Sequence, residues 1–259
     1  VTAAMTVSAP LMAWALEHDI VVLHTNDIHC GINDNIGFAG LAQIKKDALA
    51  RTPNVALVDA GDAIQGAPIG KLSRGLAVVD IMNYLGYDFC IPGNHEFDYG
   101  MDRFMELVPL QRAGYYCANF VYAGNNKQVL PGYKIMQYED TKVAFVGAST
   151  PESLTTSTPT FFQNEKGQYI YSFCEDKSGS KLYKQLQKNV DKARKEGADY
   201  VFIVGHLGMD GTTPQWSSES VAKNTQGVDA VIDGHSHERF TRMAVSYTHL
   251  RAHETCADL

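Results

Sequence analysis

Short apolar runs alternate with amphipathic helical patterns along most of the chain. In the first half the apolar runs lie at 20–23, 55–58 and 89–91. Each is followed by a polar or glycine-bearing loop and then by apolar residues at helical spacing, at 38–50, 76–85 and 101–112. Strands that alternate with helices in this way form largely parallel sheets that are buried on both faces. The order therefore predicts an α/β fold.

The second half continues this pattern less regularly. Further β-rich runs lie at 142–147, 200–204 and 230–232, and a charged helix is predicted at 181–195. The segments 122–138 and 155–179 are rich in Thr, Asn, Gly and aromatic residues, which favours irregular excursions from the core. Because no internal repeat or low-complexity linker divides the chain, we expect one domain.

Charge and cysteine usage exclude several classes of protein. The 259 residues carry 22 basic and 29 acidic side chains, a formal net charge of −7. No basic run offers a footprint for a phosphate backbone, so we expect no polymeric nucleic acid as a partner, and no protein partner is evident. A small anionic substrate held by metal ions is still compatible with this charge. The five cysteines are widely spaced and form no C-x-x-C pair, which favours isolated thiols over a disulfide framework or a thiolate zinc site.

The opening of the chain has the character of an export signal. Residues 1–15 are poor in charge and end in Ala-Trp-Ala, a small-x-small pattern typical of signal-peptide cleavage. We predict that 1–18 is a signal-peptide remnant, with a disordered or helical arm as the alternative. The expected location is the periplasm, the cell surface or the medium. No stretch reaches the ~18 apolar residues of a membrane span.

Polar side chains suited to catalysis gather directly after the predicted strands. They are Asp27, His29, Asp62, Asn94, His95, His206, His235 and His237. In open α/β sheets, ligands bind beyond the carboxyl ends of the strands. A single His or Asp at a strand end is more often structural than functional. Such residues follow five of the predicted strands, which favours a common site.

The types of side chain in this set indicate metal-assisted hydrolysis. Imidazole, carboxylate and carboxamide ligands without thiolate suit Zn, Mn, Co or Fe in a hydrolytic site better than a structural zinc site. A bridging carboxylate can hold two such ions about 3.5–4 Å apart, where they stabilise both the attacking and the leaving oxygen at phosphorus. Phosphoester hydrolysis is the chemistry that this set favours.

The same residues lie in five ordered motifs that resemble a known family. The motifs are Asp27-Ile28-His29, Gly61-Asp62, Gly93-Asn94-His95-Glu96, Gly205-His206 and Gly234-His235-Ser236-His237. Together they resemble the calcineurin-like metallophosphoesterases over roughly residues 20–240. The longer stretches 24–27, 61–66 and 93–100 are similar to the branch of bacterial 5′-nucleotidases, UDP-sugar hydrolases and 2′,3′-cyclic-nucleotide phosphodiesterases. The resemblance implies a four-layer α/β/β/α sandwich.

The resemblance also implies roles for individual residues. The first metal ion would be bound by Asp27, His29, Asp62 and His237, where some relatives have Gln at the last position. The second would be bound by Asn94, His206 and His235, with Asp62 shared between the ions. His95 would stabilise the charge that develops on the phosphoryl group, and Asp98 would orient His95. The implied activity is hydrolysis of nucleotide phosphoesters by metal-activated hydroxide.

The resemblance further implies a domain organisation. We expect a catalytic domain over 19–245, without the C-terminal nucleotide-binding domain that is usual in the branch. Residues 246–259 depart from the branch and are predicted to be an aberrant or truncated tail. Two alternatives to a nucleotide hydrolase stay open: a catalytically silent module stabilised by metal, and a related metallohydrolase with a non-nucleotide substrate.

Overall fold

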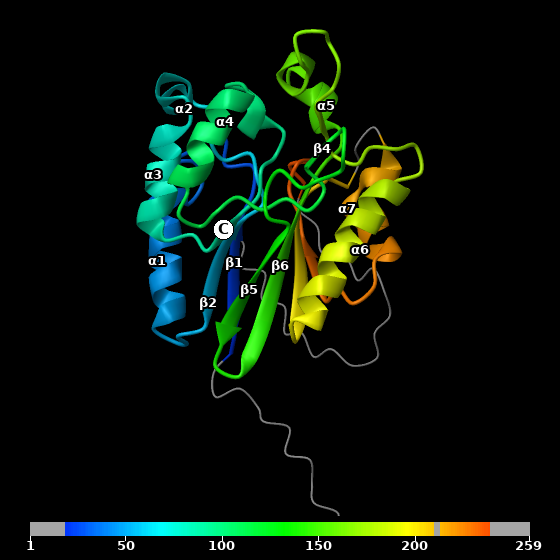
Figure 1. Cartoon of the computed structure of the whole chain (residues 1–259). Helices are drawn as coiled ribbons and strands as arrows, with labels where there is room; N and C mark the ends of the chain where they lie inside the picture. Colours follow the sequence, from blue (N-terminus) through cyan, green and yellow to red (C-terminus); the bar gives the residue numbers. More distant parts are fainter. Residues whose placement is uncertain (1–18, 210–212, 239–259) are drawn as a thin grey trace, which may run out of the picture.

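The computed structural model describes residues 19–209 and 213–238, which form two β-sheets facing each other between helices (Figure 1). The predicted segments 1–18 and 246–259, and the last residues of the predicted domain 19–245, lie outside the described residues. The expected domain boundaries therefore stay predictions.

The first sheet has the order β1-β2-β3 and is wholly parallel. Its strands are β1 (Val21–Thr25), β2 (Val55–Asp59) and β3 (Phe89–Cys90). The second sheet has the order β5-β6-β8-β9, with strands β5 (Tyr133–Tyr138), β6 (Thr141–Ser149), β8 (Tyr200–His206) and β9 (Ala230–Ile232). Only β5 runs antiparallel to its neighbour in this sheet. A separate antiparallel pair joins β4 (Val121–Tyr122) to β7 (Tyr171–Ser172).

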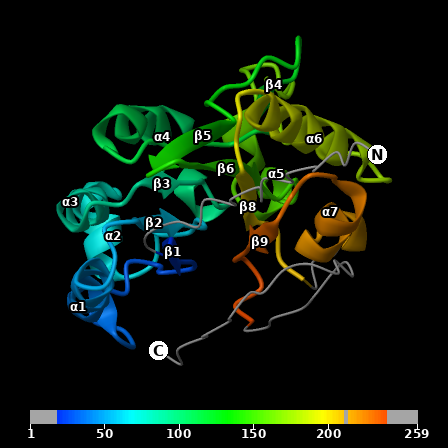
Figure 2. The ribbon, with the colours of Figure 1, turned by 90° about the horizontal axis from the view of Figure 1, so that it is seen from below.

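Helices cover the outer face of each sheet, as Figures 1 and 2 show. On the side of the first sheet lie α1 (Gly37–Leu49), α2 (Pro68–Ser73), α3 (Leu76–Leu85) and α4 (Met101–Leu107). On the side of the second lie α6 (Ser180–Lys195) and α7 (Ser218–Asn224), and α5 (Ser153–Thr156) is a single turn after β6. Short 3₁₀ turns occur at His95–Phe97, Val108–Leu110, Pro159–Phe162 and Pro214–Trp216.

Three buried clusters confirm the four-layer α/β/β/α arrangement. Successive strand residues point to opposite faces. On β2, Leu57 packs in the cluster under the first group of helices, whereas Ala56 and Val58 pack between the two sheets. On β6, Phe145 lies between the sheets and Val146 packs in the cluster with α6. Both sheets are therefore buried on both faces.

Two predicted segments were wrong in detail. The stretch 122–138, predicted as an irregular excursion, contains β5, whose Tyr133 packs toward α6 and whose Met136 packs between the sheets. The helix predicted over 101–112 ends at Leu107, because Pro109 cannot continue it and a 3₁₀ turn follows.

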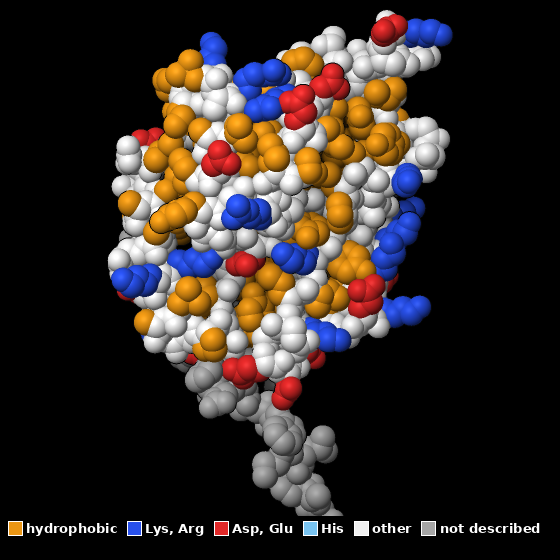
Figure 3. Space-filling model, turned by 60° about the vertical axis from the view of Figure 1, so that its left-hand side comes forward, with side chains coloured by type: hydrophobic (Ala, Val, Ile, Leu, Met, Phe, Trp, Pro, Cys, Tyr) orange, Lys and Arg blue, Asp and Glu red, His pale blue; other side chains and the backbone are white. Residues whose placement is uncertain are grey.

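The described cysteines are isolated thiols, and the surface drawn in Figure 3 mixes charges of both signs. Cys30, Cys90, Cys117 and Cys174 are buried and free. On the face drawn in Figure 3, basic and acidic side chains are interspersed rather than gathered by sign. Among the described residues, no helix combines the length and the apolar character needed to cross a membrane.

Candidate metal centre

The carboxyl ends of strands from both sheets meet at one place. In the second sheet, parallel pairing sets Ser149 beside His206. Across the two sheets, His206 Nδ1 donates to Ala60 O at 2.8 Å, and within the first sheet the Asp27 N–H donates to Gly61 O at 3.0 Å, which joins the loops after β1 and β2. The loop after β9 joins them, because the His235 N–H donates to Asp27 Oδ1 and Oδ2 at 3.1 and 3.0 Å. The predicted strand-end residues are thus brought together.

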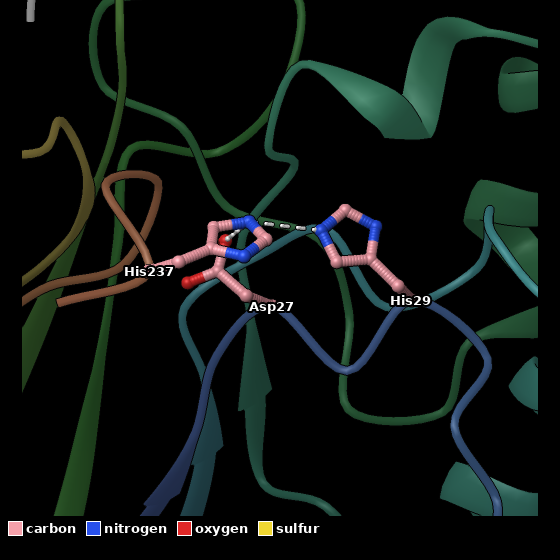
Figure 4. Close-up of side chains that lie close together, drawn as sticks. All are labelled: Asp27, His29 and His237. Atoms are coloured by element: carbon pink, nitrogen blue, oxygen red, sulfur yellow. Dashed lines mark hydrogen bonds and ion pairs between the residues drawn. The ribbon is translucent and has the colours of Figure 1, made fainter.

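One group of possible ligands comprises Asp27, His29 and His237, which point toward one another in Figure 4. The Nε2 atoms of His29 and His237 are 3.2 Å apart, and His237 Nε2 is 3.5 Å from Asp27 Oδ1. His29 Nδ1 lies 3.2 Å from Gln65 O, a contact in which Nδ1 carries the proton and leaves Nε2 with a lone pair toward the group. Three electron-pair donors therefore face one small volume.

A second group comprises Asp62, His206 and His235. His206 is fully buried and its Nδ1–H donates to Ala60 O, so Nε2, 3.0 Å from Asp62 Oδ2, is the ring nitrogen that remains for a cation. His206 Nε2 and Asn94 Oδ1 are buried and have no hydrogen-bond partner among the described residues. Ligand atoms about 2.1 Å from a common ion lie about 3 Å apart when they subtend a right angle, so this spacing fits a metal ion.

The pKa shifts of Asp62 and His206 also indicate a site for a cation. Burial alone would lower the pKa of His206, but the charge of Asp62 and its contact with the ring raise it to about 10. Burial would raise the pKa of Asp62, whereas the neighbouring His206 imidazolium lowers it to about 2. The space between the two side chains therefore favours positive charge, which a bound cation would supply.

Asp62 lies between the two groups. Its Oδ2 is 3.0 Å from His206 Nε2 and 3.9 Å from His29 Nε2, and its Oδ1 accepts the His95 N–H at 2.8 Å. A Cβ on Gly93 would overlap Asp62 Oδ1, so only glycine permits this approach. The position fits a carboxylate shared by two ions.

Backbone strain concentrates on this centre. Asp27, His29, Asp62, His235 and His237 all adopt positive φ, between 47° and 83°. Non-glycine residues rarely adopt this conformation, and it persists where surrounding contacts over-determine it. The strained turns hold the side chains at the strand ends.

His95 stands beside the ligand groups rather than in them. Its Nδ1 lies 2.6 Å from Asp98 Oδ2, and its ring contacts that of His29 edge to face with centroids 5.2 Å apart. Asp98 Oδ1 in turn accepts the Ser157 hydroxyl at 3.1 Å. The hydrogen bond to Asp98 raises the pKa of His95 above its usual value, against the effect of burial. The chain thus orients a partly exposed imidazole and favours its cationic form.

Glu96 has a structural role beside this centre. Its buried carboxylate accepts four backbone N–H groups, from Asp62 (2.8 Å), Ala63 (2.8 Å), Ile64 (3.3 Å) and Gly93 (2.6 Å). The side chain thereby fastens the loop after β2 to the loop after β3. The sequence predicts a structural or capping role for Glu96, and these contacts with backbone N–H groups make that role structural.

Substitution of Glu96 by Gln is expected to destabilise the fold by about 3 kcal/mol, because an amide NH₂ would face backbone donors that a buried carboxylate now satisfies. For a chain of this size the melting temperature would fall by roughly 2–4 °C per kcal/mol. Thermal unfolding followed by circular dichroism measures this. Glu106→Gln is the control, since that side chain is 63% exposed and forms a surface pair with Arg103. Equal stability of the two variants would contradict the role of Glu96.

The chain is similar to known proteins over most of its length. The sequence profile of the calcineurin-like phosphoesterases matches residues 20–239. The chain is 28% identical over 247 residues to the snake venom 5′-nucleotidase of Gloydius brevicauda, covering 88% of this chain and 38% of that protein. It is 26% identical over 252 residues to the 2′,3′-cyclic-nucleotide 2′-phosphodiesterase/3′-nucleotidase of Haemophilus influenzae, covering 86% and 36%. The chain thus matches well under half the length of these relatives.

Solved structures show the same likeness. The calcineurin-like phosphoesterase YfkN of Bacillus subtilis superposes with a TM-score of 0.73 at 25% identity, over 86% of this chain and 74% of that one. The sulfate thiohydrolase SoxB of Thermus thermophilus gives 0.66 at 29% identity, over 80% and 35%. With its profile match across residues 20–239, the chain belongs to the calcineurin-like phosphoesterase family.

Proposed function

We propose that this chain hydrolyses phosphoesters of nucleotides at a centre for two divalent metal ions, of Zn, Mn, Co or Fe. The observation that carries the proposal is the pair of adjoining ligand groups with Asp62 between them. The first ion would be held by Asp27, His29, Asp62 and His237. The second would be held by Asp62, Asn94, His206 and His235.

The bound ions would supply Lewis acidity, which polarises the phosphoryl oxygens and the attacking water. The other steps belong to the chain. Hydrogen bonds to Gln65 O and Ala60 O hold protons on Nδ1 of His29 and His206, which keeps both Nε2 atoms available as ligands. The protonated His95, oriented by Asp98, would donate from Nε2 to the charge that develops on the phosphoryl group.

The nucleotide as substrate rests on the names of the similar proteins, which include 5′-nucleotidases and a cyclic-nucleotide phosphodiesterase. The likeness to a sulfate thiohydrolase makes an S-sulfonate the informative competitor. Neither substrate is read from the geometry alone, because the ligand groups would contact only the reacting anion.

The test combines metal analysis with a substrate panel on the 259-residue chain. We expect two equivalents of metal, hydrolysis of AMP or 2′,3′-cyclic AMP, loss of activity with a chelator and its return with Mn²⁺ or Zn²⁺. The panel adds UDP-glucose, an aryl phosphate, a bis(aryl) phosphate and S-sulfocysteine. A metal-loaded chain that cleaves none of the phosphoesters, or only S-sulfocysteine, would contradict the proposal.

Replacing Asp98 by Asn is expected to shift the pH dependence of hydrolysis. Asp98 raises the pKa of His95, so the cationic imidazole persists to higher pH and activity falls only as the pH rises through that raised pKa. Without the carboxylate the pKa drops, and the falling limb of kcat against pH should move to lower pH. A kcat profile measured with saturating metal tests this, with Ser157→Ala as the milder control. An unmoved alkaline limb would contradict the role of Asp98.

We further propose that the protein is exported, on the signal-like pattern of residues 1–15. Those residues lie outside the described part of the chain. Cell fractionation with an antibody to the chain tests the location, and recovery of the protein only with the cytosol would contradict it.

A further inference from the structure

We propose that Glu152 is a positioning residue for the second metal site, which orients His235 so that its Nδ1 binds the ion. The inference rests on the proposed two-metal centre and adds a residue that none of the motifs contains. Glu152 lies in the turn between β6 and α5, at the carboxyl end of a central strand.

The sheet brings this turn to the metal centre. Parallel pairing of β6 with β8 places Ser149 beside His206, and the Thr150 N–H donates to His206 O at 2.8 Å. Glu152, two residues further on, therefore reaches the second ligand group. Its Oε2 lies 3.6 Å from His235 Nε2.

The carboxylate is held firmly. Its side chain is only 9% exposed, and Oε1 accepts the Thr213 N–H at 3.0 Å. The Glu152 carbonyl accepts the backbone N–H groups of Thr155 and Thr156, both at 2.8 Å. A buried carboxylate fixed at both its backbone and one oxygen can direct the side chain that faces its other oxygen.

His235 has one ring nitrogen left for the ion. Its backbone is tied to the Asp27 carboxylate through the His235 N–H. With Nε2 facing Glu152, that nitrogen is the one to carry the proton, and Nδ1 keeps the lone pair. A carboxylate behind a ligand histidine fixes its tautomer and increases its basicity, and its loss typically lowers metal affinity 10–100-fold.

The test is a calorimetric titration of metal-free chain with Zn²⁺ in wild type and in Glu152→Gln. Glutamine keeps the volume but loses the charge that holds the Nε2 proton. We expect the wild type to bind two equivalents, and the variant to bind one of them about 10–100-fold more weakly with the other unchanged. The matched control is Glu175→Gln, because Glu175 also accepts a backbone N–H, from Phe173, but lies outside both ligand groups.

A second measurement needs no variant and so does not depend on its folding. In the zinc-loaded wild type with ¹⁵N-labelled histidine, two-bond couplings should show His235 protonated at Nε2. A proton on Nδ1, unchanged zinc binding in Glu152→Gln, or equal weakening of both equivalents would overturn the inference. Failure of the wild type to bind zinc would instead overturn the proposed function, so the two failures are distinguishable.

Discussion

Asp62→Asn is expected to remove metal from both sites at once and to lower kcat by on the order of 10³ or more, roughly 4 kcal/mol at 1.36 kcal/mol per decade. Asp62 is the side chain whose Oδ2 faces both ligand groups, at 3.0 Å from His206 Nε2 and 3.9 Å from His29 Nε2. Asparagine removes the negative charge shared by the ions. It keeps an oxygen that can still accept the His95 N–H, so the strand-end loops should hold.

The matched comparison is His237→Ala. His237 belongs only to the first group, and its side chain is 58% exposed, so its loss should weaken one equivalent of metal and leave the other in place. Metal content by mass spectrometry after dialysis, together with kcat, separates the two variants. An Asp62→Asn protein that retains two equivalents and normal turnover would rule out a shared carboxylate.

The layered fold was predictable because its strands carry strong signals. The run that became β2 is apolar over 55–58 and that of β6 is apolar over 143–146, as strands buried on both faces require. Helix α3 begins and ends at Leu76 and Leu85, the residues predicted, because Gly86 in the left-handed conformation ends it. The meeting of the candidate ligand residues at one place followed from the rule that ligands bind at the carboxyl ends of strands.

What the sequence did not reveal depends on pairing and on distant contacts. Strand β5 is an edge strand that follows a loop containing Asn and Gly, and its apolar residues divide between two faces, so no alternation of apolar and polar residues stands out. Helix α2 has only six residues, although Pro68 at its first position is a recognisable start signal.

The partners of Glu152 and Glu96 could not be predicted for a similar reason. Both acquire their roles from loops far away in the sequence, through His235 and through the Asp62 turn. An acidic residue just after a predicted strand was the available signal for Glu152. Which nitrogen it faces depends on the register of β6 with β8, which a single sequence does not specify.

The last expected result separates a ligand from a residue that acts on the developing charge. His95→Ala should keep both equivalents of metal but lower kcat by about 10²–10³, the size seen when one preorganised oxyanion donor is removed. The His95 side chain belongs to neither ligand group, and the backbone N–H that supports Asp62 remains in alanine. An interaction made mainly in the transition state changes kcat more than ground-state binding.

Added imidazole tests whether His95 acts in catalysis, because it would not restore kcat to His95→Ala if His95 had only a structural role. The His95 side chain is 34% exposed, so its removal opens a space that solvent reaches, beside Asp98. Free imidazole that binds in that space can be oriented by Asp98, as the His95 ring is, and should restore part of kcat to His95→Ala. It should do so less in His95→Ala/Asp98→Ala, which lacks the carboxylate. Loss of metal from His95→Ala would identify His95 as a metal ligand. Its proposed role in stabilising the developing charge would then be wrong.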